Sequence, residues 1–134
     1  MLDTPRAGPA ARATYRLTIP DWHPSKLNEY LGRHWSVKHR LKRHDAVMVG
    51  WYARAAAIPP ATGKRRVSLV ITLAPRQRAF DVDAPWKSLL DALTGAGLLV
   101  DDSPRWCELG TVEFIRGPAR RTEIFLEDLT QGPF

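Results

Sequence analysis

The residues best suited to chemistry in this sequence are carboxylates that gather in one short stretch. Asp81 and Asp83 lie two positions apart in a segment, Phe80–Asp83, that we predict to be extended. Alternate residues of an extended chain point to the same side, so these two carboxylates would repel each other without a neutralising cation. Hard oxygen ligands suit Mg²⁺ or Mn²⁺, and Mg²⁺ is usually held by a few carboxylates plus substrate phosphate. The spacing therefore predicts a site for a divalent metal.

Further charged residues follow this pair. Lys87 lies four residues beyond Asp83, about one turn into a predicted helix, where its ammonium could reach a phosphate beside the metal. If the apolar segment Leu98–Val100 runs back beside the extended stretch, Asp101 or Asp102 would complete the acidic cluster. Neighbouring residues of a strand face opposite ways, so only one of those two would be a direct ligand.

Each of these residues also has an ordinary structural interpretation. Asp83 could be no more than the N-cap of the helix that begins at Pro85. Lys87 and Asp91 could form only a surface ion pair, worth about 0.3–0.5 kcal/mol, and residues 101–104 could be a simple turn. Taken singly, these interpretations are favoured. The combination of all these residues in one short chain favours the metal site.

A basic middle section accompanies the acidic cluster. From Arg33 to Arg78 the chain has eleven basic residues and one acid, whereas from Ala79 to Phe134 it has five basic residues and ten acids. A basic block suggests a polyanionic partner such as nucleic acid, because Lys and Arg displace counterions condensed on phosphates. The alternative is that the charge serves solubility alone. The candidates for contacts with a DNA backbone are Lys38, Arg40, Lys42, Arg43, Lys64, Arg65 and Arg66.

The elements that must position these residues follow from hydrophobic periodicity. We predict strands over Thr14–Ile19 and Arg66–Leu73, the second of them apolar on both faces and therefore central. We predict a short helix from Ser25 through Leu31, a long helix over Ser36–Ala57 and a helix over Trp86–Thr94.

The long helix is expected to bury one stripe of side chains that recur every three or four residues. Its members are Val37, Leu41, His44, Met48, Tyr52 and Ala55. The last third of the chain predicts a hairpin, with strands Trp106–Ile115 and Thr122–Leu126 joined across Gly117–Pro118.

Length and composition limit the class of protein. The 134 residues fit one domain, which we place at 14–128 between tails at 1–13 and 129–134. The order of elements predicts a mixed α/β or α+β fold with a mixed sheet. Cys107 is the one cysteine, so disulfides within the chain and cysteine-rich zinc sites are excluded, and we expect a buried thiol. No segment looks like a membrane helix or a secretion signal, so we expect a cytoplasmic protein.

A family resemblance lies in the same residues. The pattern Asp-x-Asp-x-x-x-Lys-x-x-x-Asp-x-Leu, which begins at Asp81 and is followed by Gly97 and Asp101-Asp102, resembles the RusA-type Holliday-junction resolvases. Upstream, Pro24-Ser25-x-x-Asn28 is similar to the entry region of that family, with one extra residue here. The resemblance runs from about Thr14 to Leu126. It implies a RusA-like fold and a homodimeric, Mg²⁺-dependent endonuclease of bacterial or phage origin that cuts four-way DNA junctions.

The resemblance also implies a role for each motif residue. It makes Asp81, Asp83 and Asp102 the metal ligands and Lys87 the catalytic lysine. It gives Asp91 a supporting role, which we extend to Asp101. One position departs from the family, because Ala84 stands where an Asn is usual, and loss of such a helix-capping side chain typically costs about 1 kcal/mol.

Other functions remain open from the sequence. A DNA-junction-binding module of the same fold could lack catalysis, although all the candidate ligands are present. A metal-dependent hydrolase of small phosphate esters would not need an extended basic surface. A structural protein with acidic turns would bind no metal at all.

Overall fold

A computed structural model describes residues 13–24 and 35–129 of the chain, and it omits the side chains of 35–39 and of 41. The short helix expected from Ser25 to Leu31 lies outside the described residues, as do most of the two tails. Within them the fold is a single small mixed α+β domain, as predicted from the order of the elements.

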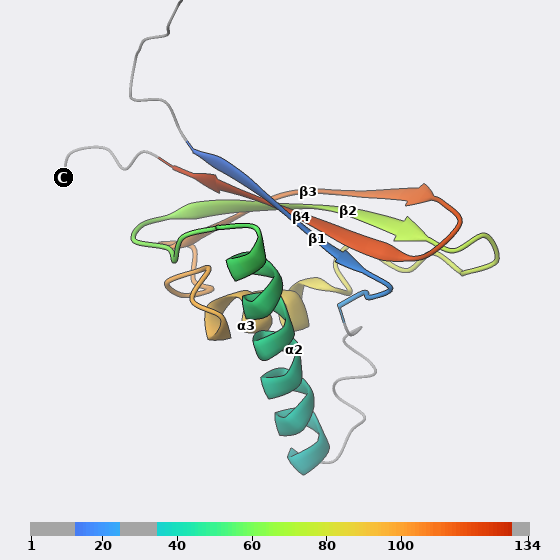
Figure 1. The fold of residues 1–134 in the computed structure, drawn as a ribbon, viewed down its shortest axis with the longest axis horizontal. Helices are drawn as coiled ribbons and strands as arrows, with labels where there is room; N and C mark the ends of the chain where they lie inside the picture. Colours follow the sequence, from blue (N-terminus) through green and yellow to red (C-terminus); the bar gives the residue numbers. More distant parts are fainter. Residues whose placement is uncertain (1–12, 25–34, 130–134) are drawn as a thin grey trace, which may run out of the picture.

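The framework is a four-stranded mixed sheet with both helices on one face (Figure 1). In chain order the elements are β1 (Thr14–Pro20), α2 (Trp35–Ala55), β2 (Arg65–Leu73), α3 (Trp86–Gly95), β3 (Cys107–Arg116) and β4 (Arg121–Asp128). Across the sheet the strand order is β1-β4-β2-β3. β2 is parallel to β3 and antiparallel to β4, and β4 is antiparallel to β1.

The predicted C-terminal hairpin is wrong. Both strands form, but β2 lies between β3 and β4. The connecting chain passes the end of β2, where the Gly117 N–H donates to the Leu73 carbonyl at 3.0 Å. A Cβ on Gly117 would come within 2.8 Å of Thr72 Cγ2, so this approach requires glycine. The apolar β2 needs a neighbour on each side, and this demand outweighs the local tendency of consecutive strands to pair.

The core lies between the sheet and the helices. The side chains of Val67, Leu69, Ile71 and Leu73 are each at most 2% exposed, which confirms β2 as a central strand. They belong to one cluster with Leu89 and Leu93 of α3, Val49 and Ala53 of α2, and Ile124 and Leu126 of β4. Cys107 is also buried there, as expected.

The long helix forms close to its predicted bounds, but over its described side chains the buried stripe is displaced by one residue; the predicted stripe residues Val37 and Leu41 lie outside them. His44 and Ala55 are exposed, whereas Asp45, Val49 and Ala53 are buried. A periodicity argument favours apolar residues on the inner face, so it could not place an acid such as Asp45 there. None of the helices within the described ranges is long and apolar enough to cross a membrane.

Candidate functional site

The loop after β2, residues 74–80, leads the chain to Asp81 and is held by its own polar groups and by β3. The Gln77 N–H donates to the Ala74 carbonyl at 3.0 Å, and the Ala74 N–H donates to Gln77 Oε1 at 3.1 Å. From the end of β3, Arg116 Nη1 donates to the carbonyls of Ala74 at 3.0 Å, Pro75 at 3.4 Å and Gln77 at 2.6 Å. One guanidinium therefore fixes three points of the loop path.

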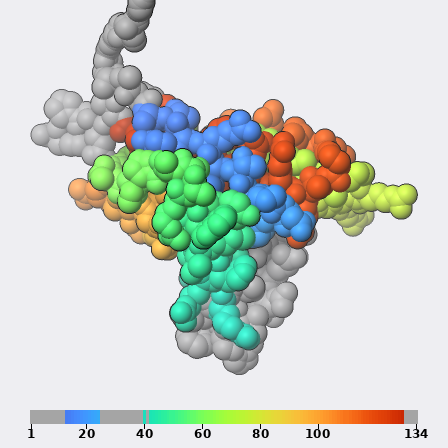
Figure 2. Space-filling model, viewed as in Figure 1, coloured from blue at the N-terminus to red at the C-terminus, as the bar shows by residue number. Residues whose placement is uncertain are grey.

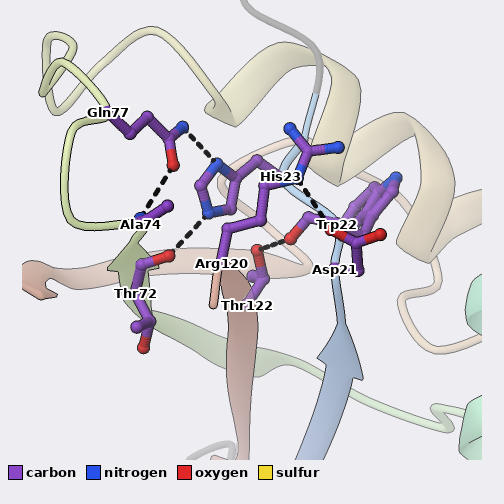
Figure 3. A network of polar contacts seen from close by, with 8 residues as sticks. All are labelled: Asp21, Trp22, His23, Thr72, Ala74, Gln77, Arg120 and Thr122. Atoms are coloured by element: carbon purple, nitrogen blue, oxygen red, sulfur yellow. Dashed lines mark hydrogen bonds and ion pairs between the residues drawn. The ribbon is translucent and has the colours of Figure 1, made fainter. Parts of the chain in front are cut away.

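A second support comes from the segment after β1 (Figure 3). The imidazole of His23 lies between the Thr72 carbonyl, 2.8 Å from Nε2, and the Gln77 side-chain nitrogen, 3.0 Å from Nδ1. At the other end of the loop, the Phe80 ring lies 5.2 Å from the Phe114 ring, edge to face. The backbone that enters the acidic stretch is thus held on both sides.

Asp81 and Asp83 lie in a turn rather than in the predicted extended segment. The Ala84 N–H donates to the Asp81 carbonyl at 3.0 Å, and the Trp86 N–H donates to the Asp83 carbonyl at 3.4 Å. The start of α3 bends the chain here, so the argument that alternate residues share a side does not apply. Pro85 occupies the N-cap position with no side-chain capping bond, so the N-cap interpretation of Asp83 is not observed. Both side chains are exposed.

Lys87 and Asp91 meet as their spacing predicts, and a third residue joins them. Lys87 Nζ lies 3.7 Å from Asp91 Oδ1, and Lys42 Nζ of α2 lies 3.6 Å from Asp91 Oδ2. The Asp91 side chain is only 14% exposed, whereas that of Lys87 is 55% exposed. One carboxylate shared by two ammonium groups leaves a net positive charge, and Lys87 presents its part of that charge to solvent.

Asp101 and Asp102 follow the C-terminal end of α3, six and seven residues after Gly95. The segment before them does not run back beside the acidic turn, since the Leu98 carbonyl accepts a hydrogen bond from Arg65 at the start of β2, at 3.0 Å. Ten residues of α3, about 15 Å of helix, separate the two acidic groups. Asp101 accepts the Ser103 N–H at 3.4 Å, which fits the simple-turn interpretation of 101–104.

The surroundings of Asp102 agree with this placement. Burial, and then the nearby Asp102 carboxylate, raise the pKa of the Cys107 thiol to about 11. Cys107 is the first residue of β3 and pairs with Arg65 at the start of β2, whereas Asp81 follows the end of β2.

No three-aspartate metal site is assembled in this conformation. Among residues 13–24 and 35–129, no group of three or more His, Cys, Asp or Glu side chains is placed to hold a metal ion. Asp81 and Asp83 remain two exposed carboxylates on one turn. Mg²⁺ often takes only one or two carboxylates from a protein and fills its octahedron with water and substrate phosphate. These two residues have the right chemistry for that arrangement, and Asp102 as a third ligand does not fit it here.

Comparison with known proteins gives no family. No protein-family model matches the chain, and no curated protein matches it either. The resemblance to RusA-type resolvases therefore depends on the motif residues themselves.

The predicted DNA-contact residues have different environments. Arg65 is 1% exposed and donates to Asp128 Oδ1 at 2.7 Å and to the carbonyls of Leu98 and Pro59, both at 3.0 Å. It therefore holds the fold together and cannot reach a phosphate in this conformation. Arg66 points to the opposite face of the sheet and pairs with Glu108 and Glu127, both at 2.7 Å.

The remaining candidates keep more freedom. Arg40 and Arg43 are exposed on α2, and Lys64 is half-buried. The side chain of Lys42 is 46% exposed and lies beside Asp91, and the side chain of Lys38 is not among those that the structure describes.

Two basic residues were missed among the DNA-contact candidates. Arg76 and Arg78 belong to the loop 74–80, which projects beyond the sheet on the right of Figures 1 and 2; Arg76 is exposed and Arg78 follows it by two residues. They precede Asp81 by five and three residues, so their position directly before the carboxylate pair was the available signal. No local pattern pointed to His23, Gln77 or Arg116, because they act through contacts made only in the folded chain.

Proposed function

We propose that this protein is a Mg²⁺-dependent endonuclease that cuts branched DNA, preferably four-way junctions, as a homodimer. The observation that supports the proposal is the placement of two exposed carboxylates between cationic groups. Asp81 and Asp83 lie on a turn whose approach is held by Arg116, with Arg76 and Arg78 before it and Lys87 one helical turn after it. The chain therefore carries cationic residues directly before and directly after this turn.

In this proposal, each residue of the site has a separate role. Bound Mg²⁺ would supply polarisation of a phosphodiester and a lower pKa for a water molecule. Asp81 and Asp83 would hold the ion, and Lys87 would stabilise negative charge that grows on the phosphate oxygens. Asp91 would position the ammonium of Lys87, and the expected products carry 5′-phosphate and 3′-hydroxyl ends.

The homodimer follows from the substrate. A four-way junction has approximate two-fold symmetry, and two symmetric cuts need two sites, which a dimer supplies through one interface. Asp102 belongs to the site only if DNA or a partner copy brings it to Asp81, because α3 separates the two in the single chain.

A second candidate is a DNA-junction-binding module without catalysis. The specific observation in its favour is the absence, in the described ranges, of an assembled metal site. The same cationic groups would then bind the junction, and Asp81 and Asp83 would have no chemical role.

The test uses a labelled four-way junction and a linear duplex of the same sequence, each incubated with Mg²⁺ or with a chelator. We expect paired nicks in the junction alone, and only with Mg²⁺. Asp81→Asn should lower cleavage at least 100-fold and keep junction binding, since it removes negative charge near DNA. Glu113→Gln, which changes an exposed acid of β3, is the matched control and should cleave normally.

The outcomes separate the candidates. Tight junction binding with no cleavage in any divalent metal supports the binding module. Equal cutting of the linear duplex contradicts junction selectivity. Asp102→Asn with wild-type cleavage removes Asp102 from the site, whereas a loss as large as that of Asp81→Asn shows that Asp102 reaches the site in the DNA complex.

A further inference from the structure

The hydrogen bonds between His23 and the loop determine which ring nitrogen of His23 carries a proton. The Thr72 carbonyl can only accept, so His23 Nε2 must carry a proton. The Ala74 N–H can only donate, so it fixes the Gln77 amide with its oxygen toward Ala74 and its nitrogen toward His23. That nitrogen can only donate, so His23 Nδ1 must accept. The arrangement requires a neutral imidazole with its proton on Nε2.

We infer that neutral His23 is a positioning residue for the acidic turn, and that protonating it releases Gln77 and loosens the loop that leads to Asp81 and Asp83. A proton on Nδ1 would place two donors 3.0 Å apart, one on His23 and one on Gln77. Gln77 would then turn away and withdraw its oxygen from the Ala74 N–H as well. The release of the loop stands on geometry alone, and only its effect on cleavage rests on the proposed function.

The position of His23 explains why a local change would reach the site. Its segment is held on the far side by the Thr122 hydroxyl, which donates to the Trp22 carbonyl at 2.7 Å, and by the Asp21 N–H, which donates to the Arg120 carbonyl at 2.9 Å (Figure 3). His23 is therefore a fixed support, and the loop is the partner that moves. Arg116 keeps its hold on the loop carbonyls, so the expected effect is local loosening rather than unfolding.

The charged groups around His23 come from several elements. Asp21, two residues before it, is paired with Arg120 at 3.2 Å. On α2, Asp45 lies 3.6 Å from His44 and is hydrogen-bonded to Trp22, the residue before His23. The loop and the end of β3 contribute cations: Arg76, Arg78 and Arg116. A positive charge on His23 would add to the cations of the loop that it supports, whereas Asp21 and Asp45 already have cationic or hydrogen-bonding partners.

The first experiment measures the ring nitrogens of His23 by NMR in the full chain, together with hydrogen exchange of the Ala74 and Gln77 amides. At pH 8 we expect the Nε2–H tautomer and protected amides. When the pH is lowered until the ring signals show protonation, we expect a loss of protection of at least tenfold, after correction for the intrinsic exchange rate. The control His44→Gln, which alters an exposed histidine of α2, should show the same response. An Nδ1–H tautomer at pH 8, or full protection with a protonated ring, would overturn the inference.

The second experiment replaces the hydrogen-bond donor that faces His23 Nδ1 with an acceptor. In Gln77→Glu the carboxylate can accept from a protonated His23 and from the Ala74 N–H at once. The loop should then keep its protection at the acid pH at which the wild type loses it, and Mg²⁺-dependent junction cleavage should persist in acid where that of the wild type falls. The same acid response in both proteins would overturn the inference.

The two proposals fail separately. If no cleavage occurs at any pH, the nuclease proposal fails and the exchange data still decide the role of His23. If cleavage occurs and its pH profile is identical in wild type and Gln77→Glu despite a released loop, the loop does not position the site and the inference is overturned.

Discussion

Arg65 and Arg66 are neighbours in the sequence with opposite surroundings. The Arg65 guanidinium is buried on the core side of β2 and donates hydrogen bonds to one carboxylate and two carbonyls. Arg66 points to the other face of the sheet, a third exposed, between Glu108 and Glu127. A buried charge needs its hydrogen-bonding partners, because removing one member of such a contact leaves the other member buried and unpaired. The two arginines contribute equally to the net charge of the chain. Only the alternation of side chains between the two faces of a strand distinguishes the buried arginine from the exposed one.

These surroundings predict different costs of substitution. Arg65→Met should lower the free energy of unfolding by about 2–3 kcal/mol, since it leaves the buried Leu98 carbonyl, the part-buried Pro59 carbonyl and Asp128 without their donor. Arg66→Met should cost clearly less than Arg65→Met, because exposed ion pairs are screened by water. Urea denaturation of both variants measures the difference. Equal costs would contradict the structural role of Arg65.

Asp45 gives the stability a dependence on pH. Burial raises the pKa of its carboxyl above the usual range, against the opposing effect of hydrogen bonds with His44 and Trp22. The folded state therefore binds this proton more readily than the unfolded state, and the stability that results is present in acid and lost as the pH rises through the raised pKa. The stability of Asp45→Asn relative to wild type should accordingly rise between pH 4 and pH 7. Chemical denaturation at several pH values tests this, and a fall over that range would contradict it.

At the level of elements, α2 and α3 approach each other closely at the C-terminal end of α3. A Cβ on Gly95 would lie 2.9 Å from the Ala46 Cβ, which is closer than real Cβ atoms approach each other. A Cβ on Gly50 would find its nearest neighbours at 3.5 Å and 3.7 Å, which is ordinary van der Waals distance. Gly95 thus allows the two helices to pack, whereas Gly50 only makes α2 more costly to form.

Replacing Gly50 and Gly95 with alanine should change the free energy of unfolding in opposite directions. Gly50→Ala should raise the free energy of unfolding by about 0.5–1 kcal/mol, since alanine loses less backbone entropy within a helix. Gly95→Ala should lower it, because the added methyl group must push the helices apart. Thermal unfolding of the two variants is the measurement. A gain in stability from Gly95→Ala would show that the helices can separate freely.

The elements also show what the sequence could and could not predict. β2 and α3 were predicted within one residue at each end, because their apolar periodicity and Pro85 are local signals. The strand order was not predicted, since a place in the middle of a sheet depends on partners far along the chain. The same holds for the site. The contact between Lys87 and Asp91 could be predicted from the sequence, because the two residues are one helical turn apart. His23 and Gln77 are 54 positions apart and left no local pattern.

At the level of the whole molecule, charge is sorted between two surfaces. The sheet face opposite the helices carries acids and bases that neutralise each other, with Arg16 paired to Glu123 and Arg66 to two glutamates. The exposed basic residues of α2 and those of the loop 74–80 are elsewhere. A polyanion would therefore bind along the helix and the loop rather than across the sheet.

This sorting predicts which arginines contribute to the salt dependence of DNA binding. Replacing Arg76 and Arg78 together with alanine should weaken junction binding and reduce the slope of log K against log salt by about 0.9 for each phosphate that the protein no longer neutralises. Arg66→Ala should leave the slope unchanged. Fluorescence anisotropy with a labelled junction at several salt concentrations gives both slopes. An equal reduction from Arg66→Ala would show that DNA crosses the sheet face instead.

The position of β4 has a consequence for how the protein is made. β4 follows the other described strands along the chain, yet it lies between β1 and β2 and is what joins them. Until Asp128 has left the ribosome exit tunnel, β1 has no neighbour in the sheet and β2 has a free edge. A nascent chain can form α2 and the β2–α3–β3 unit, but it must wait until translation has passed β4 before this sheet closes.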